Sequence, residues 1–144
     1  RIGRSVFRIL AEKGDHDIVA INDISDPQSL AYLLKYDSVM GPLKVPVTLE
    51  DGILKTGSQE CRMLAERDPS QLPWKELGVD VVIEPTGRFR SRSECQMHLD
   101  AGAEKVILTV PPKDPVDAMV VGWVARPTRL LSIKQAQSLR ELHG

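Results

Sequence analysis

The chain has 144 residues, of which 42% are hydrophobic and 27% charged, so its length suits about one globular domain and its composition excludes a disordered segment. Its 19 Lys and Arg nearly balance 20 Asp and Glu, and the net charge of −1 predicts no nucleic-acid or membrane partner. Two cysteines are too few for a disulfide framework and predict no metal site, which favours a reducing, cytoplasmic location. No apolar run approaches the roughly 18 residues that span a bilayer.

The first quarter of the chain alternates between helix and strand patterns. Apolar residues at helical spacing predict a helix at residues 2–13, and Gly14 follows it where a left-handed cap is favoured. The short apolar run at residues 18–21 predicts a strand buried on both faces of a parallel sheet. An N-cap aspartate followed by proline then predicts a helix over residues 27–35.

The middle of the chain changes to a strand pattern. Apolar residues alternate over residues 45–49, and the Asp-Gly pair at 51–52 is typical of a hairpin turn. Further short strands are predicted at residues 53–56 and 60–64. We expect a small antiparallel insertion here.

The remaining elements return to alternation, which predicts an α/β fold. The expected fold is Rossmann-like, with a mostly parallel sheet, a small antiparallel insert and the first strand missing. The elements expected are a helical turn at 74–77, a strand at 79–83, a helix from the Ser91–Glu94 capping box to just before Gly102, and strands at 106–110 and 118–121.

Two residues have the spacing of a dinucleotide site. The fingerprint GxGxxG ends in a glycine just inside the first helix, and an acidic residue about 20 positions later binds the adenosine ribose. Gly3 lies inside the first expected helix, and Asp23 follows it by 20 positions (23 − 3). On these two residues alone, a cofactor site and a purely structural role are both open.

Longer motifs add a specific resemblance. Together they resemble the NAD-binding half of phosphorylating glyceraldehyde-3-phosphate dehydrogenase, in register over residues 1–121. The motifs are RIGRSVFR at 1–8, AIND at 20–23, LLKYDSVMG at 33–41, AERDP at 65–69, LPWKELGVDVVIE at 72–84, TGRF at 86–89 and HLDAGAEKVILTVP at 98–111.

The resemblance implies NAD as the cofactor and assigns residues to its adenosine and pyrophosphate. Arg1 and Ile2 match backbone contacts to the pyrophosphate, and Gly3 matches the last fingerprint glycine. Asn22 and Asp23 match the adenosine-ribose site, where the Asp23 carboxylate accepts hydrogen bonds from both ribose hydroxyls. A carboxylate at this position repels the additional phosphate of NADP, so NAD is favoured.

The resemblance assigns five further residues around the cofactor. Arg67 matches the residue beside the adenine. Thr86 and Gly87 match the strand-end loop against the cofactor, and Phe89 is its apolar residue. Thr109 matches a position on the nicotinamide side.

The parent enzyme, as the resemblance implies, is a cytoplasmic homotetramer that oxidises and phosphorylates glyceraldehyde 3-phosphate with NAD in glycolysis. The alternatives are an erythrose-4-phosphate dehydrogenase fragment and a non-catalytic nucleotide-binding remnant. Residues 1–121 are expected to form a partial NAD-binding domain, whose first two fingerprint glycines would precede residue 1. Residues 122–144 are expected to be a non-family tail with helical spacing, and Pro85 stands where the family has a small residue such as serine.

No catalytic residue is assigned in this chain, which alone is expected to be inactive. The family's nucleophilic cysteine has no match, and Cys61 and Cys95 are both expected to be structural because neither has an activating histidine or helix start nearby. His98 lies in the middle of an expected helix, where a surface position or a satisfied side chain accounts for it.

Overall fold

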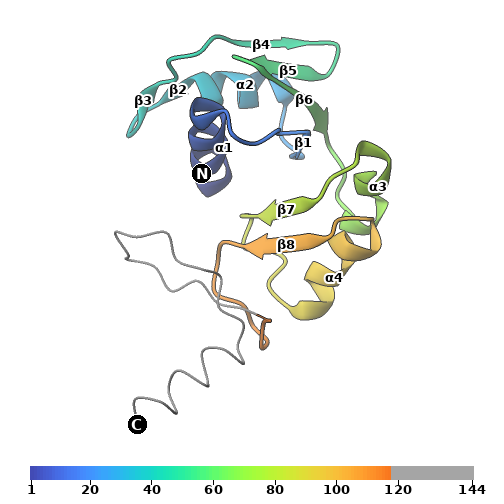
Figure 1. Cartoon of the computed structure of the whole chain (residues 1–144). Helices are drawn as coiled ribbons and strands as arrows, with labels where there is room; N and C mark the ends of the chain where they lie inside the picture. The colour runs from blue at the N-terminus through green and yellow to red at the C-terminus, as the bar shows by residue number, and fades with distance from the viewer. Residues whose placement is uncertain (118–144) are drawn as a thin grey trace.

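The computed structural model describes residues 1–117 of the chain (Figure 1). The helices are α1 (Ile2–Lys13), α2 (Pro27–Lys35), α3 (Trp74–Leu77) and α4 (Arg92–Asp100), with a 3-10 turn, η1, at Pro69–Gln71. The strands are β1 (Ala20–Asn22), β2 (Tyr36–Asp37), β3 (Gly41–Pro42), β4 (Val47–Glu50), β5 (Ile53–Thr56), β6 (Gln59–Leu64), β7 (Val81–Glu84) and β8 (Lys105–Leu108).

The first two helices confirm the predicted caps. Gly14 adopts the left-handed conformation at φ 66°, and its N–H donates to the carbonyl of Leu10 at 3.0 Å. At α2 the carboxylate of Asp26 accepts from the N–H of Ser29 at 2.8 Å. Local sequence therefore sets the bounds of both helices.

The first strand lies two residues later than its apolar run predicts. The expected range of 18–21 is wrong because the N–H of Ile18 donates to the side-chain oxygen of Gln59 at 2.9 Å, outside the strand ladder. The Gln59 amide in turn donates to the carbonyl of His16 at 2.8 Å. This buried glutamine replaces backbone pairing at the start of the run.

The antiparallel insertion forms as predicted, but it is continuous with the main sheet. Asp51 (φ 50°) and Gly52 (φ 74°) form the turn between β4 and β5. Strand β6 pairs antiparallel with β5 and also parallel with β1, which gives the order β1-β6-β5-β4. The described pairing is therefore mixed, and the short β2–β3 hairpin was not predicted.

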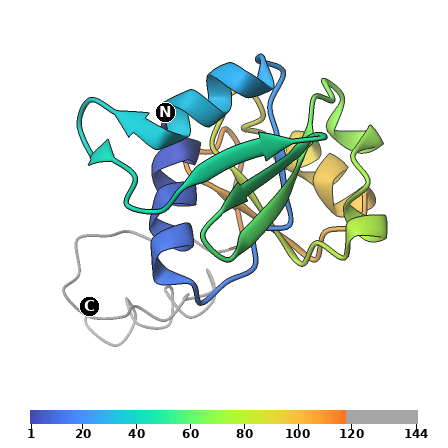
Figure 2. The same cartoon turned by 90° about the horizontal axis from the view of Figure 1, so that it is seen from above.

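Helices α1 and α2 cover one face of this sheet. Their side chains Phe7 and Leu34 form a buried cluster with Leu54 of β5 and Cys61 of β6. Figure 1 shows both helices below β4 and β5, and Figure 2 shows the same elements from above. The amphipathic spacing of the two helices thus forms the first core.

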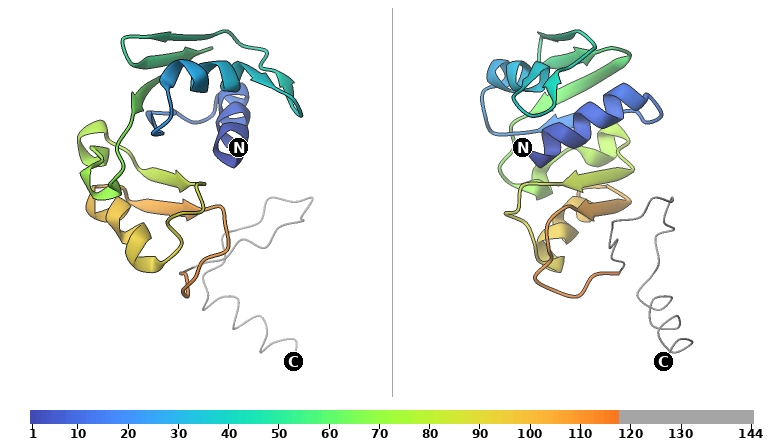
Figure 3. Two further views of the ribbon diagram at one scale, coloured as in Figure 1. Left: turned by 180° about the vertical axis from the view of Figure 1, so that it is seen from behind. Right: turned by 90° about the vertical axis from the view of Figure 1, so that its left-hand side faces the viewer.

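The second unit of the fold is the parallel pair β7–β8 with α3 and α4. Its buried cluster contains Leu72, Trp74, Val82 and Ala103, and partly buried Ala20 of β1 packs against it. Both hydrogen bonds of the capping box form at the start of α4: the Ser91 hydroxyl accepts from the N–H of Glu94, and the Glu94 carboxylate accepts from the N–H of Ser91. Figures 1 and 3 show this unit on the far side of α1 from the antiparallel strands.

These elements confirm the α/β class with a Rossmann-like βαβ pattern. Within residues 1–117, β1 pairs only with β6 and β7 only with β8. None of the described helices has the length and apolarity that a bilayer crossing requires. The strand expected at 118–121 and the tail at 122–144 lie outside the described residues.

Candidate nucleotide-binding site

The N-terminus of α1 is available to an anion. Arg1 occupies its N-cap without a side-chain hydrogen bond, and the first turn contains no acidic residue. By contrast, Asp26 caps α2 and Ser91 caps α4. Because the first N–H groups of a helix have no intrahelical acceptor and carry the positive end of the helix dipole, α1 offers donors to a phosphate group.

Gly3 brings this helix start against the end of β7. A Cβ built on Gly3 would lie 2.9 Å from Cγ of Pro85, so only glycine allows the observed approach. The sequence indicates that Pro85 removes a backbone donor at this strand end. In the structure the Pro85 ring lies against Gly3 at the start of α1. The next N–H, that of Thr86, donates to the Glu84 carboxylate.

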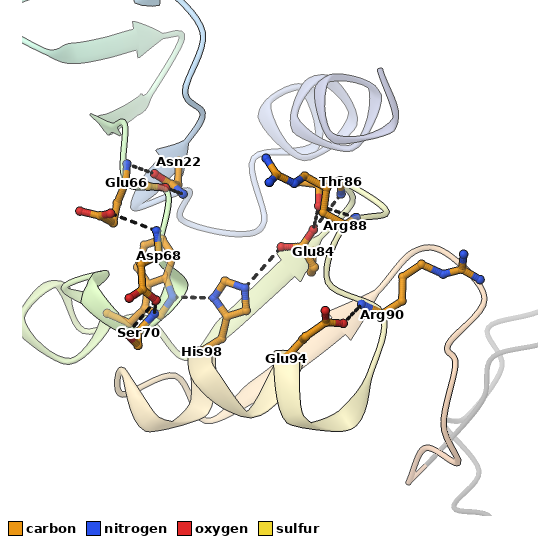
Figure 4. A network of polar contacts seen from close by, with 11 residues as sticks. Asn22, Glu66, Asp68, Ser70, Glu84, Thr86, Arg88, Arg90, Glu94 and His98 are labelled. Carbon is orange, nitrogen blue, oxygen red and sulfur yellow. Dashed lines mark hydrogen bonds and ion pairs between the residues drawn. The ribbon is translucent and has the colours of Figure 1, made fainter.

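A hydrogen-bonded turn follows β7 (Figure 4). Glu84 Oε1 accepts from the N–H of Thr86 at 2.8 Å and from its hydroxyl at 2.5 Å. The Thr86 hydroxyl oxygen accepts from the N–H of Arg88 at 3.1 Å, and Gly87 between them adopts φ 74°. A buried carboxylate thus shapes the turn that contains two of the expected cofactor residues.

The end of β8 lies beside this turn. The N–H of Thr109 donates to the carbonyl of Glu84 at 3.2 Å, and a Cβ on Gly87 would lie 3.9 Å from Val110. The hydroxyl of Thr109 is buried and finds no hydrogen-bond partner within residues 1–117. Such an orphaned polar atom suits a group that is absent from the structure.

Asn22 joins the ends of β1 and β6. Its amide nitrogen donates to the carbonyl of Glu66 at 2.9 Å, and its amide oxygen accepts from the N–H of Glu66 at 2.8 Å. Both side-chain polar atoms of Asn22 are therefore used within the protein, and this clamp places Arg67 next to the end of β1. Arg67 is exposed.

Asp23 directly follows β1 and is half-buried. Its Oδ1 accepts from the N–H of Ser25 at 2.8 Å, which fixes the carboxylate at the strand end. The sequence predicts Asp23 after the strand, and the structure agrees although the strand itself is shifted.

The expected site residues therefore form two groups, both at carboxyl ends of parallel strands. The first group lies around Pro85 and Glu84 and comprises Arg1, Ile2, Gly3, Thr86, Gly87, Phe89 and Thr109. The second group comprises Asn22, Asp23 and Arg67. The geometry fits nucleotide phosphates and ribose at the strand ends of an α/β sheet.

Three buried residues beneath the first group were missed at the sequence level. His98, Glu84 and Trp74 have relative exposures of 4%, 4% and 5%. Of the two alternatives for His98, the satisfied side chain is confirmed and the surface position is wrong. The sequence contains no local signal for this burial of His98, because the contacts join residues 14 and 24 positions apart.

Burial raises the pKa of Glu84, but hydrogen bonds from His98 and Thr86 outweigh it and lower the pKa overall. Burial raises the pKa of the Cys61 thiol to about 12 and also raises that of Cys95. A nucleophilic cysteine requires a lowered pKa, so neither thiol has the environment of a catalytic thiolate.

The fold and these strand-end groups define a dinucleotide-binding α/β domain. Residues 1–92 match the family model described as the NAD binding domain of glyceraldehyde 3-phosphate dehydrogenase. The chain belongs to the glyceraldehyde 3-phosphate dehydrogenase family, of which it contains NAD-binding-domain sequence.

Relatives from three bacteria have names that agree with this family assignment. Glyceraldehyde-3-phosphate dehydrogenase of Borreliella burgdorferi is 53% identical over 127 residues, covering 85% of this chain and 38% of the relative. The enzymes named alike in Thermotoga maritima and Geobacillus stearothermophilus are 50% and 47% identical, over 85% of this chain and 37% and 36% of their own lengths. The chain thus spans less than two fifths of these relatives.

Proposed function

We propose that this chain binds NAD along the carboxyl ends of β1, β6, β7 and β8. The pyrophosphate lies at the first turn of α1, where Arg1 and Ile2 offer backbone N–H groups and Gly3 leaves room. Asp23 accepts the adenosine ribose hydroxyls, and Arg67 lies beside the adenine. The contact between Gly3 and Pro85 is the observation that carries the proposal, since it joins the uncapped helix start to a strand end.

The nicotinamide side is formed by the turn after β7 and the end of β8. Thr86, Gly87 and Phe89 provide the turn, and Thr109 contributes a hydroxyl that has no hydrogen-bond partner within residues 1–117. NAD supplies a hydride acceptor when bound.

For the whole protein, we propose the oxidation and phosphorylation of glyceraldehyde 3-phosphate in the cytoplasm by a homotetramer. The names of the relatives favour the glyceraldehyde substrate over erythrose 4-phosphate. Exposed Tyr32 and Val39, at 65% and 73%, provide apolar surface for subunit contacts. Residues 1–121 form the cofactor domain and residues 122–144 a separate segment in this proposal. This chain alone does not turn over, since neither of its thiols suits the nucleophile.

Calorimetric titration with NAD tests the cofactor assignment, using Asp23→Asn and Asp80→Asn as a matched pair. Asp80 is an exposed carboxylate just before β7, at the opposite end of that strand. Loss of a charged hydrogen-bond acceptor costs about 1.5–3 kcal/mol, so Asp23→Asn should weaken NAD binding about 10- to 100-fold. Asp80→Asn should leave the affinity unchanged.

The same titration with NADP provides the specificity control. We expect the wild-type chain to bind NADP far more weakly than NAD, and Asp23→Asn to narrow that difference. NAD binding without turnover would favour a non-catalytic nucleotide-binding module, and a folded chain that does not bind NAD would favour a decayed remnant. Equal NAD affinities for Asp23→Asn and the wild type would contradict the ribose assignment.

A further inference from the structure

A buried polar chain connects α3, α4 and β7 beneath the expected nicotinamide side (Figure 4). Trp74 Nε1 lies 3.1 Å from His98 Nδ1, and His98 Nε2 lies 3.3 Å from Glu84 Oε2. All three residues are at least 95% buried. None of them belongs to the residues assigned to the cofactor.

The donors and acceptors of this chain have only one consistent arrangement. The indole nitrogen of Trp74 can only donate, so Nδ1 of His98 accepts and its ring proton lies on Nε2. Nε2 then donates to the ionised carboxylate of Glu84. In this arrangement Nδ1 serves as the acceptor and Nε2 as the donor, and a hydrogen on Nδ1 would face the indole N–H of Trp74.

The chain continues from Glu84 into the turn after β7. The second carboxylate oxygen accepts both the N–H and the hydroxyl of Thr86, which in turn accepts from the N–H of Arg88. His98 also contacts the far end of the turn, since its ring meets the Phe89 ring edge-on with centroids 6.4 Å apart. One imidazole thus supports the turn at both ends.

We propose that His98 is a positioning residue, which through Glu84 and Phe89 holds the Thr86–Phe89 turn in the shape that receives the nicotinamide side of NAD. This inference rests on the proposed NAD binding. His98 needs an acceptor toward Trp74 and a donor toward Glu84 to act in this way. A glutamine side chain offers the same pair of groups and leucine offers neither.

The test compares His98→Leu with His98→Gln in the full chain, by calorimetric titration with NAD and by amide exchange of Thr86 and Arg88 without NAD. His16→Leu is the control, because His16 is an exposed imidazole whose side chain contacts only Asp15 among the described residues. We expect His98→Leu to weaken NAD binding about tenfold or more and to speed exchange at both turn amides. His98→Gln should stay within about threefold of the wild type, as should His16→Leu.

A second variant keeps the test decisive if His98→Leu does not fold. Glu84→Gln places an amide donor or a weaker acceptor against His98 and Thr86, and should also weaken NAD binding about tenfold. Nitrogen-15 spectra of the His98 ring should show the proton on Nε2 in the wild type, and Glu84→Gln, which removes the carboxylate acceptor, should weaken that preference.

The outcomes separate this inference from the function on which it rests. If the wild type binds NAD and both His98→Leu and Glu84→Gln bind it equally well, the inference is overturned while the proposed function stands. Equal losses in His98→Leu and His98→Gln would also overturn it, since packing alone would then account for the effect. Failure of the folded wild type to bind NAD would overturn both.

Discussion

Replacing Gly3 with alanine tests the contact between α1 and the turn after β7. The added Cβ would lie 2.9 Å from Cγ of Pro85, against about 3.5–4.0 Å for a normal carbon contact. The proline ring is rigid, so α1 or the turn must move. Overpacking of this kind costs about 1–3 kcal/mol, and the better helix propensity of alanine offsets at most about 1 kcal/mol of it.

Pro85→Ala provides the matched partner, because it removes Cγ and keeps Cβ, which would stand 3.6 Å from the new methyl carbon of Gly3→Ala. Urea unfolding of the wild type, the two single variants and the double variant forms a double-mutant cycle. The cycle cancels the effect of proline on the unfolded chain. We expect a coupling free energy of about 1–3 kcal/mol, with the double variant more stable than the two single effects predict. A coupling within about 0.3 kcal/mol of zero would refute the contact.

Two further predictions concern the helix cap and the strand edge. Hydrogen bonds from Ser91 and Arg90 lower the pKa of Glu94 to about 2, so its contribution to stability is present above pH 4.5 and lost as the pH falls toward 2. Carbon-13 titration should give that midpoint, and a midpoint near 4.5 would contradict the capping box. Strand β7 pairs only with β8 in residues 1–117, so the N–H of Val82 faces β8 and that of Ile83 faces away. Hydrogen exchange should be faster at Ile83 than at Val82 by at least about tenfold, and equal protection would show a partner on the other edge.

Elements with local signals could be predicted from the sequence. The Asp26 cap, the Gly14 cap, the Asp51–Gly52 turn and the capping box at Ser91 each depend on residues within four positions of one another, and all four form as expected. Their physical cause is short-range hydrogen bonding and backbone preference.

Elements that depend on distant partners could not be predicted. Strand β1 starts late because Gln59, 41 positions away, takes the N–H of Ile18. The pairing of β6 with β1 likewise joins segments whose own patterns do not specify each other. Apolar periodicity therefore located these strands but did not fix their ends or neighbours.

The candidate site also contains residues that the sequence could predict and residues that depend on distant contacts. The spacing of Gly3 and Asp23 is that of the last fingerprint glycine and the ribose-binding carboxylate of a dinucleotide site. The longer motifs assigned the other cofactor residues by resemblance. His98 and Glu84 have no local signal, because their importance comes from burial and from contacts among α3, α4 and β7. Only the three-dimensional arrangement shows that a buried network supports the exposed turn.

Mapping NAD onto the backbone amides of the chain by NMR tests the proposed cofactor site most directly. We predict that shifts on addition of NAD concentrate at Gly3, Asp23, Gly87 and Thr109, at the start of α1 and the carboxyl ends of the parallel strands. The amides of Asp80 and Glu104, at the opposite ends of β7 and β8, should stay unchanged. Shifts concentrated at those opposite ends, or none in a folded chain at millimolar NAD, would contradict NAD binding at this site.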